Sequence, residues 1–330
     1  MTPPTSSAEV AASPTIAPAI VTIDLPALER DRPDAPIYSQ RTNSGVEAEK
    51  SRARTSGMAP MPRPLALVPR LSKPNSLSLR ATAKVPLMGV RLDCVTEKQV
   101  TTHVIANIRA GAGGWIVTPN VDHLRIISEQ PDLLRMVNEA SLRVADGMPL
   151  VWASRLQGTP LPERITGAGL VLSLTAAAAK AGASIFLLGG EPGDAEAAAA
   201  TLKRFNPELK IAGILCPRPG FEHDPLQMTE IGNALHSAKP DLVYSCFGFP
   251  KQEIVIRALR ERLPSAWFLG LGGSLAIVSG RTRRAPRWMQ NIGMEWIWRL
   301  GLEPRRLFQR YIVKDLPFAI RLLGNALVQH

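Results

Sequence analysis

The architecture of this chain is best inferred from Ser184-Ile185-Phe186-Leu187-Leu188-Gly189-Gly190-Glu191-Pro192-Gly193-Asp194 and the stretch that follows it. Residues 184–188 are mostly apolar, and a run of this length suits one buried β-strand. Residues 189–194 form turns readily, and the alanine-rich stretch 195–205 has the composition of a helix. A strand, a turn and a helix in this order form part of a βαβ unit, from which parallel sheets are built.

The same order recurs on both sides of this segment. Further strands are expected at 85–90, 92–95, 115–120, 142–145, 211–215, 241–247 and 267–271, and further helices at 96–110, 149–157, 170–181 and 228–238, with others after residues 120, 131 and 248. This repetition predicts an α/β fold with a mostly parallel sheet and helices on both of its faces. Ligands of such sheets bind at the carboxyl ends of the strands, so the turns that follow the strands are the candidate site.

Charge and composition divide the chain into three parts. Residues 1–84 contain 12 of the 29 prolines and carry a net charge of +4, from 11 Lys or Arg against 7 Asp or Glu. Residues 281–330 carry +7, from 10 against 3, so these two parts account for the whole net charge of +11. We therefore expect a disordered extension at 1–84, a neutral folded core at 85–280 and a basic appendage at 281–330.

Cysteine usage and hydropathy predict a cytoplasmic protein. The three cysteines are widely spaced, which argues against a disulfide framework. The first residues lack the basic and then apolar layout of a signal peptide, and no run of 18 apolar residues occurs. Any membrane contact is therefore expected to be peripheral.

The basic appendage alternates arginine with tryptophan between residues 281 and 306. Arginine suits phosphate and tryptophan suits a membrane boundary, although a solvated basic helix has the same pattern. Further on, apolar residues with Lys314 and Arg321 beside them suit a helix lying on an anionic membrane; they are Leu316, Phe318, Ile320, Leu322 and Leu323. The alternative for this tail is ordinary packing on the core or on a subunit partner, and a homo-oligomer stays open.

Polar residues at the predicted strand ends are candidate site residues. Asp146 lies in an Asp-Gly turn, where it can serve as a general base or simply hold the turn. Thr118 and Asn120 can orient a sugar or phosphate, or cap the next helix. Gln252 can bind a sugar hydroxyl through its amide, and its neighbour Glu253 can interact favourably with the positive end of a helix dipole.

The glycine loop and the acidic residues argue against two other classes of site. Gly189 and Gly190 can let backbone amides approach a diphosphate, but the spacing is not that of a nicotinamide site, which disfavours an oxidoreductase. No Asp-x-Asp pair occurs and the five histidines do not cluster, so neither a metal nor another cofactor is expected. Nucleic-acid binding is disfavoured because the core is neutral and no strand presents stacking aromatic residues.

Taken in order, several motifs resemble those of the WecG/TagA/CpsF glycosyltransferases (glycosyltransferase family 26). They are Thr118-Pro119-Asn120-Val121-Asp122-His123, Ala145-Asp146-Gly147, Pro162-Glu163-Arg164-Ile165-Thr166-Gly167, Leu188-Gly189-Gly190, Phe247-Gly248-Phe249-Pro250-Lys251-Gln252-Glu253, Arg284-Ala285-Pro286, Glu295-Trp296-Ile297-Trp298-Arg299 and Glu303-Pro304-Arg305-Arg306. The resemblance runs from residue 85 to about residue 311. It departs from the family at Ala276, where a carboxylate is often found.

The resemblance implies a Rossmann-like core and transfer of a hexose from a UDP-sugar, with inversion and without metal. The acceptor implied is an undecaprenyl-diphosphate-linked sugar at the inner face of the plasma membrane, in exopolysaccharide or other surface polysaccharide synthesis. UDP-glucose, UDP-N-acetylmannosamine and its uronic acid all remain open as donors. The residues implied at the site are Asp146 as base, Thr118, Asn120 and Arg164 beside it, and Gly189, Gly190, Gln252, Arg284, Arg299, Arg305 and Arg306 in substrate binding. A non-catalytic nucleotide- or nucleic-acid-binding protein is the alternative.

Overall fold

The computed structural model describes residue 79 and residues 82–328. Apart from residues 79 and 82–84, the predicted disordered extension at 1–84 lies outside this described part. A hairpin of β1 (Lys84–Leu87) and β2 (Val90–Asp93) comes first, where a short strand or hairpin is predicted. The strands that follow are β3 (Gly114–Val117), β4 (Leu142–Arg143), β5 (Ser184–Gly189), β6 (Lys210–Leu215), β7 (Leu242–Cys246) and β8 (Trp267–Gly270).

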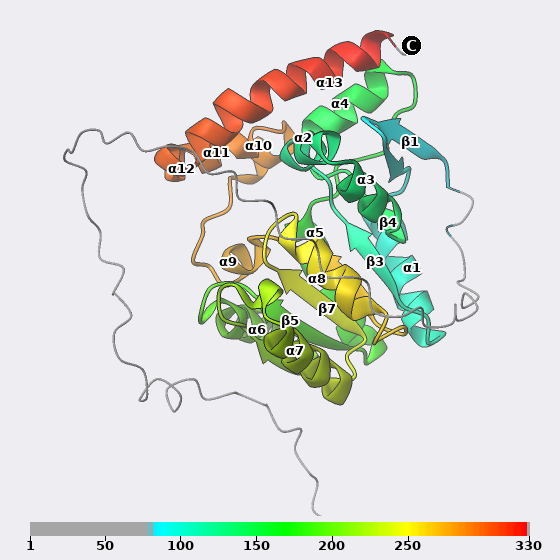
Figure 1. Ribbon diagram of the computed structural model, residues 1–330, viewed down its shortest axis with the longest axis vertical. Coiled ribbons are helices and arrows are strands. Elements are labelled where there is room, and N and C mark those ends of the chain that lie inside the picture. The colour runs from blue at the N-terminus through cyan, green and yellow to red at the C-terminus, as the bar shows by residue number, and fades with distance from the viewer. Residues whose placement is uncertain (1–78, 80–81, 329–330) are drawn as a thin grey trace, which may run out of the picture. The chain divides into compact units, whose positions relative to one another are not determined.

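These six strands form one sheet in the order β4-β3-β8-β7-β5-β6, and all neighbouring pairs are parallel. The helices of the same region are α1 (Glu97–Arg109), α2 (Val121–Glu129), α3 (Pro131–Asn138), α4 (Met148–Leu156), α5 (Gly167–Ala181), α6 (Asp194–Phe205), α7 (Pro225–Ala238), α8 (Lys251–Arg260) and α9 (Ser274–Val278). The predicted α/β fold with a mostly parallel sheet is therefore confirmed (Figure 1).

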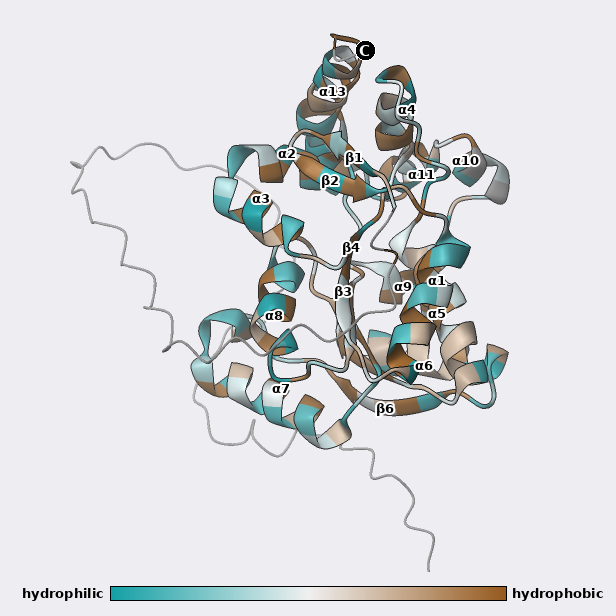
Figure 2. Cartoon of the chain, turned by 90° about the vertical axis from the view of Figure 1, so that its right-hand side faces the viewer, coloured by the Kyte–Doolittle hydropathy of each residue, from teal (hydrophilic) through white to brown (hydrophobic). Residues whose placement is uncertain are grey.

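Each face of the sheet carries its own apolar core, because successive side chains of a strand point to opposite faces. Trp115 and Val117 of β3 belong to the core beneath α2, α3, α7 and α8, whereas Ile116 belongs to the core beneath α1, α5 and α6. In β5, Phe186 and Leu187 divide in the same way. Figure 2 shows the apolar strands between these two sets of helices. This two-sided burial explains why the strands read as continuous apolar runs.

The chain after β8 forms short helices and then one long helix. These are α10 (Arg287–Asn291), α11 (Glu295–Leu302), α12 (Pro304–Phe308), a π-helix (Gln309–Asp315) and α13 (Leu316–Val328). Helix α13 packs along α4, and the π-helix packs against α2 (Figure 1). The predicted helical appendage is thus confirmed, and it lies on the core of the same chain.

Ion pairs between α2 and the π-helix hold this C-terminal segment in place. Arg310 Nη2 lies 2.8 Å from Asp122 Oδ2, and Arg125 Nε lies 3.3 Å from Asp315 Oδ1. Arg125 also pairs with Asp122 within α2, at 2.6 Å. Because Asp122 and Asp315 each pair with an arginine, the network offsets much of the cost of removing these charges from water.

Helix α13 divides the predicted tail residues between two environments. Phe318 and Leu322 are buried in the core beside α4, whereas Ile320 is 65% exposed and Leu316 is 45% exposed. The tail therefore packs on the core through one face and keeps an apolar strip on the other. No helix in the described part of the chain is both long enough and apolar enough to cross a membrane.

Candidate active site

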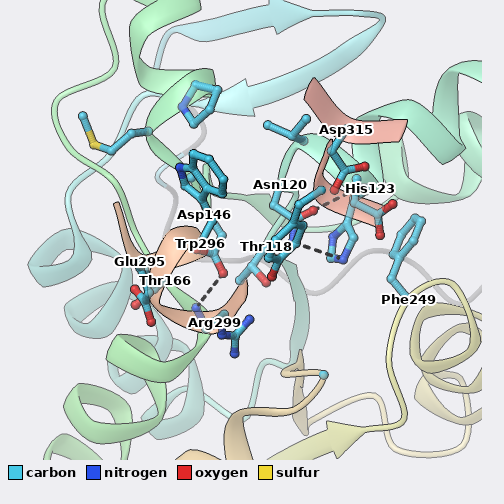
Figure 3. A pocket seen from close by; sticks show the side chains of 18 of the residues that line it. Thr118, Asn120, His123, Asp146, Thr166, Phe249, Glu295, Trp296, Arg299 and Asp315 are labelled. Carbon is cyan, nitrogen blue, oxygen red and sulfur yellow. Dashed lines mark hydrogen bonds between the residues drawn. The ribbon is translucent and has the colours of Figure 1, made fainter. Parts of the chain in front are cut away.

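A cavity of about 590 Å³ opens at the carboxyl edge of the sheet. Its walls come from the loops after β3, β4, β7 and β8 and from the C-terminal segment (Figure 3). Eight of the predicted site residues line it, namely Thr118, Asn120, Asp146, Arg164, Gln252, Arg284, Arg299 and Arg306. The fold therefore brings together residues that are up to 188 positions apart, from 118 to 306.

Asp146 follows β4, beside the end of the neighbouring strand β3. Its backbone N–H donates to Pro119 O at 2.8 Å, which continues the pairing of β4 with β3 beyond the last strand residues. One carboxylate oxygen accepts the Gly167 N–H at 3.3 Å from the start of α5. Two separate elements therefore hold Asp146 at the cavity wall, one through its backbone N–H and one through its carboxylate (Figure 3).

The protein around Asp146 makes its carboxyl group a weaker acid than usual. Burial raises the pKa of Asp146 to about 6, against the lowering effects of the Gly167 N–H and of the nearby Arg164 and Arg299. Repulsion by the Glu295 carboxylate raises the pKa further. A carboxylate with a pKa near the working pH is a stronger base than an ordinary aspartate, and still ionised at neutral pH.

Three arginines lie at the end of the cavity near Asp146. Arg164, in the loop before α5, approaches Glu295 with Nη1 3.4 Å from Oε2. Arg284, after α9, approaches the other oxygen of Glu295 with Nε at 3.5 Å and donates from Nη2 to Thr166 Oγ1 at 3.3 Å. Arg299 takes part in no ion pair within 4.0 Å among residues 79 and 82–328. Its guanidinium is therefore available to an incoming anion.

Thr118 and Asn120 follow β3 on the opposite side of Asp146. Thr118 is buried and its hydroxyl reaches Gly270 O at 3.5 Å. Asn120 caps α2 by accepting the His123 N–H at 3.0 Å, so the helix-capping interpretation holds while the residue also lines the cavity. His123 stacks on Phe249 with ring centroids 4.2 Å apart, and burial lowers its pKa to about 3. His123 is therefore neutral at physiological pH.

Gln252 is oriented by hydrogen-bond partners on two sides. Its Oε1 accepts the Gly272 N–H at 2.7 Å, and its Nε2 donates to Glu253 Oε1 at 3.0 Å. Glu253 is fully buried, and its other oxygen accepts the Trp115 Nε1–H at 2.9 Å. Gly270 makes room for both side chains, since a Cβ there would lie 2.6 Å from Gln252 Nε2. Glu253 therefore connects Gln252 in the cavity wall to Trp115 in the core beneath β3, which is more than the predicted interaction with the helix dipole.

Replacing Glu253 with alanine is expected to destabilise the fold by about 2–4 kcal/mol, because it leaves the buried N–H groups of Trp115 and Gln252 without acceptors. Urea denaturation at pH 7 measures the change. Glu261, exposed at the end of α8, is the matched control, and Glu261→Ala should change stability by less than about 0.5 kcal/mol. Equal stabilities of the two variants would show that the buried contacts of Glu253 contribute little.

Three predicted site residues lie outside the cavity lining, namely Gly189, Gly190 and Arg305. Gly189 ends β5 with φ +92°, and a Cβ there would lie 2.5 Å from the Phe247 ring. Packing against Phe247 therefore accounts for glycine at this position. Arg305 is exposed on α12, whereas its neighbour Arg306 reaches the cavity and pairs with Glu303.

Several cavity residues carry no role in the sequence prediction. Glu295 is the most informative of them, because it stands one helical turn before Arg299 on α11. That spacing places both side chains on one face of the helix, so the sequence alone could have indicated that Glu295 lies near Arg299. Figure 3 shows both near Asp146. In the described part of the chain, no group of three or more His, Cys, Asp or Glu side chains is placed to hold a metal ion.

Part of the cavity lining is apolar. This part comes from α4 and α13, through Met148, Pro149, Trp152, Leu316, Ala319, Ile320 and Leu323. Trp152 is 40% exposed and Ile320 is 65% exposed, so this part of the lining continues onto an apolar surface. One cavity thus offers both charged and apolar groups, which suits an amphiphilic ligand.

Comparison with known families agrees with this geometry. The model of the glycosyl transferase WecG/TagA/CpsF family matches residues 85–330, which include every element of the sheet and the whole C-terminal segment. Enzymes of this family act in the biosynthesis of cell-surface polysaccharides. The match begins where β1 begins, within one residue, and it contains all the residues that line the cavity. The chain therefore belongs to the WecG/TagA/CpsF family of glycosyltransferases.

Proposed function

We propose that this protein is an inverting hexosyltransferase that moves a sugar from a UDP-sugar to an undecaprenyl-diphosphate-linked sugar. The observation that carries the proposal is the position of Asp146 in a cavity that is lined both by arginines and by apolar groups. A lipid-linked diphosphate sugar needs both kinds of lining, and a sugar transfer needs a base near them. Glucose, N-acetylmannosamine and its uronic acid are the donors considered.

In the proposed reaction, Asp146 accepts the proton of an acceptor hydroxyl while that oxygen attacks the anomeric carbon of the donor. A new glycosidic bond forms as the bond to UDP breaks on the opposite face of the sugar, and UDP leaves with the electron pair. Arg284 and Arg299, together with Arg164, are the cations that stabilise the charge developing on the diphosphate. The base and the cations belong to the same cavity, as this division of roles requires.

The remaining polar groups suit the orientation of sugar hydroxyls. The amide of Gln252 is held by Gly272 and Glu253, so its orientation is set before a ligand arrives. Thr118 and Asn120 stand on the other wall, at the end of β3. Preorganised groups of this kind lose little conformational entropy when a sugar binds.

The apolar part of the cavity lining is the proposed path of the lipid, and the exposed apolar strip of α13 is the proposed contact with the membrane. Lys314 and Arg321 flank that strip and suit anionic lipid head groups. We propose a peripheral position on the inner face of the plasma membrane, which places the cavity mouth beside the lipid-linked acceptor.

The pH dependence of transfer is expected to follow Asp146. A general base must be ionised, so activity should fall about tenfold per pH unit below the pKa of about 6 and should be level above it until another group titrates. The measurement is kcat/KM for the donor from pH 4.5 to pH 8. A profile that is level down to pH 4.5 would contradict a base with a raised pKa.

The test of the proposed function is a transfer assay with a synthetic lipid-diphosphate-linked sugar and the three UDP-sugars, with products identified by mass spectrometry. A new glycosidic bond of inverted configuration supports the proposal. The same acceptor sugar without lipid should be a poorer substrate, because it leaves the apolar part of the cavity lining uncovered. Binding of nucleotides or nucleic acids without transfer to any acceptor would favour the non-catalytic alternative.

A further inference from the structure

The cluster of charges around Asp146 contains one group that the proposed reaction does not use. Glu295 is the first residue of α11, and its side chain is 16% exposed in the cavity wall. A carboxylate beside an anion-binding site weakens the binding of anions, so its presence among these arginines needs another explanation.

Glu295 connects three separate segments of the chain. One of its oxygens faces Arg164 Nη1 at 3.4 Å, and the other faces Arg284 Nε at 3.5 Å. Arg164 belongs to the loop before α5, whereas Arg284 and Glu295 lie on either side of α10. The carboxylate therefore holds two guanidinium groups from different loops at a defined separation, and Thr166 fixes Arg284 further.

Both Arg164 and Arg284 keep N–H donors that these contacts do not use. A guanidinium has five N–H donors. Glu295 accepts from one nitrogen of Arg164, and Thr166 accepts from Nη2 of Arg284, whose Nε lies 3.5 Å from Glu295 as an ion pair without a hydrogen bond. Each guanidinium thus keeps donors for a phosphate while its orientation is already set. Arg257 and Glu139, at the surface, make a comparable ion pair that is 54% and 44% exposed and lies away from the cavity lining.

We infer that Glu295 is a positioning residue of the proposed transfer, which holds Arg164 and Arg284 ready for a diphosphate and acts through its charge on Asp146. This inference rests on the proposed function. The charged groups that face Asp146 are Arg164 from the loop before α5, and Glu295 and Arg299 from α11. Burial is the main reason that the pKa of Asp146 is raised, and repulsion by Glu295 adds to it.

Charge counting gives the expected direction of each effect. Arg164, Arg284 and Arg299 against Asp146 and Glu295 amount to a net charge of +1 when all are ionised. Glu295→Gln keeps the shape of the side chain and raises this sum to +2. An anion should then bind more tightly, while the two arginines lose the group that orients them.

The experiment compares Glu295→Gln with wild type and with the surface control Glu139→Gln. For Glu295→Gln we expect kcat to fall by about tenfold or more, inorganic pyrophosphate to bind about threefold to tenfold more tightly by calorimetry, and the acid limb of the pH profile to move down by about half a unit. Glu139→Gln should leave kcat and pyrophosphate affinity within about twofold of wild type, and the acid limb within about 0.2 pH units of its wild-type position.

A second variant separates the charge of Glu295 from its reach. Glu295→Asp keeps the charge but shortens the side chain, so kcat should fall while the acid limb stays near its wild-type position. The inference is wrong if Glu295→Gln lowers only the melting temperature and leaves kcat, the acid limb and pyrophosphate affinity unchanged. If wild type transfers no sugar, the proposed function fails, and the pyrophosphate titration still tests Glu295 because it needs no turnover.

Discussion

Replacing Asp146 with asparagine is expected to lower kcat by about 10²- to 10⁴-fold, the usual contribution of a general base, while UDP binds at least as tightly as to wild type because one negative charge is removed. Asparagine has nearly the same shape and can still accept the Gly167 N–H, but it cannot take a proton from the acceptor. Turnover is measured with saturating donor and acceptor, and UDP affinity by calorimetry.

The same variant should not be less stable at high pH. The pKa of Asp146 in the folded protein is about 6, above its ordinary value of 3.8, so its protonated form stabilises the fold at low pH. That contribution is fully present below about pH 4 and is lost as the pH rises through 6. Asp146→Asn has no charge to bury, so at pH 8 it should match or exceed wild-type stability by up to about 3 kcal/mol.

Urea denaturation of both proteins at pH 4.5 and pH 8 measures this difference. Asp132→Asn is the matched control, because Asp132 is exposed on α3 and pairs with Arg135, three residues further on. Full turnover in Asp146→Asn would remove Asp146 from the reaction. Loss of turnover together with a large loss of stability at pH 8 would instead indicate a structural carboxylate.

Replacing Arg299 with alanine is expected to reduce kcat/KM for the donor by about 10²- to 10³-fold, comparable to the removal of one preorganised donor from a transition state. Arg299 stands out because it lines the cavity on the same helix face as Glu295 and makes no ion pair in the described part of the chain. Its guanidinium is therefore engaged by no ion pair among the described residues, although its charge acts on the nearby Asp146. Steady-state kinetics with varied UDP-sugar provides the measurement.

Arg299→Lys keeps the charge but loses the planar fork, so it should recover only part of the activity. Arg257→Ala serves as the control, since Arg257 pairs with Glu139 at the surface of α8 and lies outside the cavity lining. If Arg299→Ala and Arg257→Ala have the same kcat/KM, then Arg299 does not bind the diphosphate. The cationic role would then fall to Arg164 and Arg284.

Much of the fold and part of the site follow from local sequence patterns. The apolar run 184–188 predicts β5, and the helix expected at 96–110 is α1, which the Thr96 side chain caps. Asp146 and Thr118 are expected to lie close together because both follow parallel strands, and both line the cavity. Such inferences succeed because strands and caps depend on neighbouring residues and because parallel strands share one carboxyl edge.

Other features needed the packed chain. In sequence, Gly189 and Gly190 at the end of β5 look as suitable for binding a diphosphate as any other strand-end turn. In the structure neither of them lines the cavity, and close packing against the Phe247 ring accounts for the glycine at position 189. The apolar residues of the tail look alike in sequence, but contact with α4 buries Phe318 and Leu322 and leaves Ile320 exposed. Periodicity says which residues share a helix face, and only the neighbouring element decides whether that face is covered.

By itself the sequence determined the parallel α/β architecture, the basic C-terminal segment and the family, since each of these rests on local patterns or on motifs in order. Only the tertiary structure decided which charges meet: Glu295 lies between Arg164 and Arg284, 131 positions after the first of them. It also decided the proton affinity of Asp146, whose pKa is raised mainly by burial. Burial and Coulomb energy depend on distances in space, and those distances are set when elements far apart in the chain pack together.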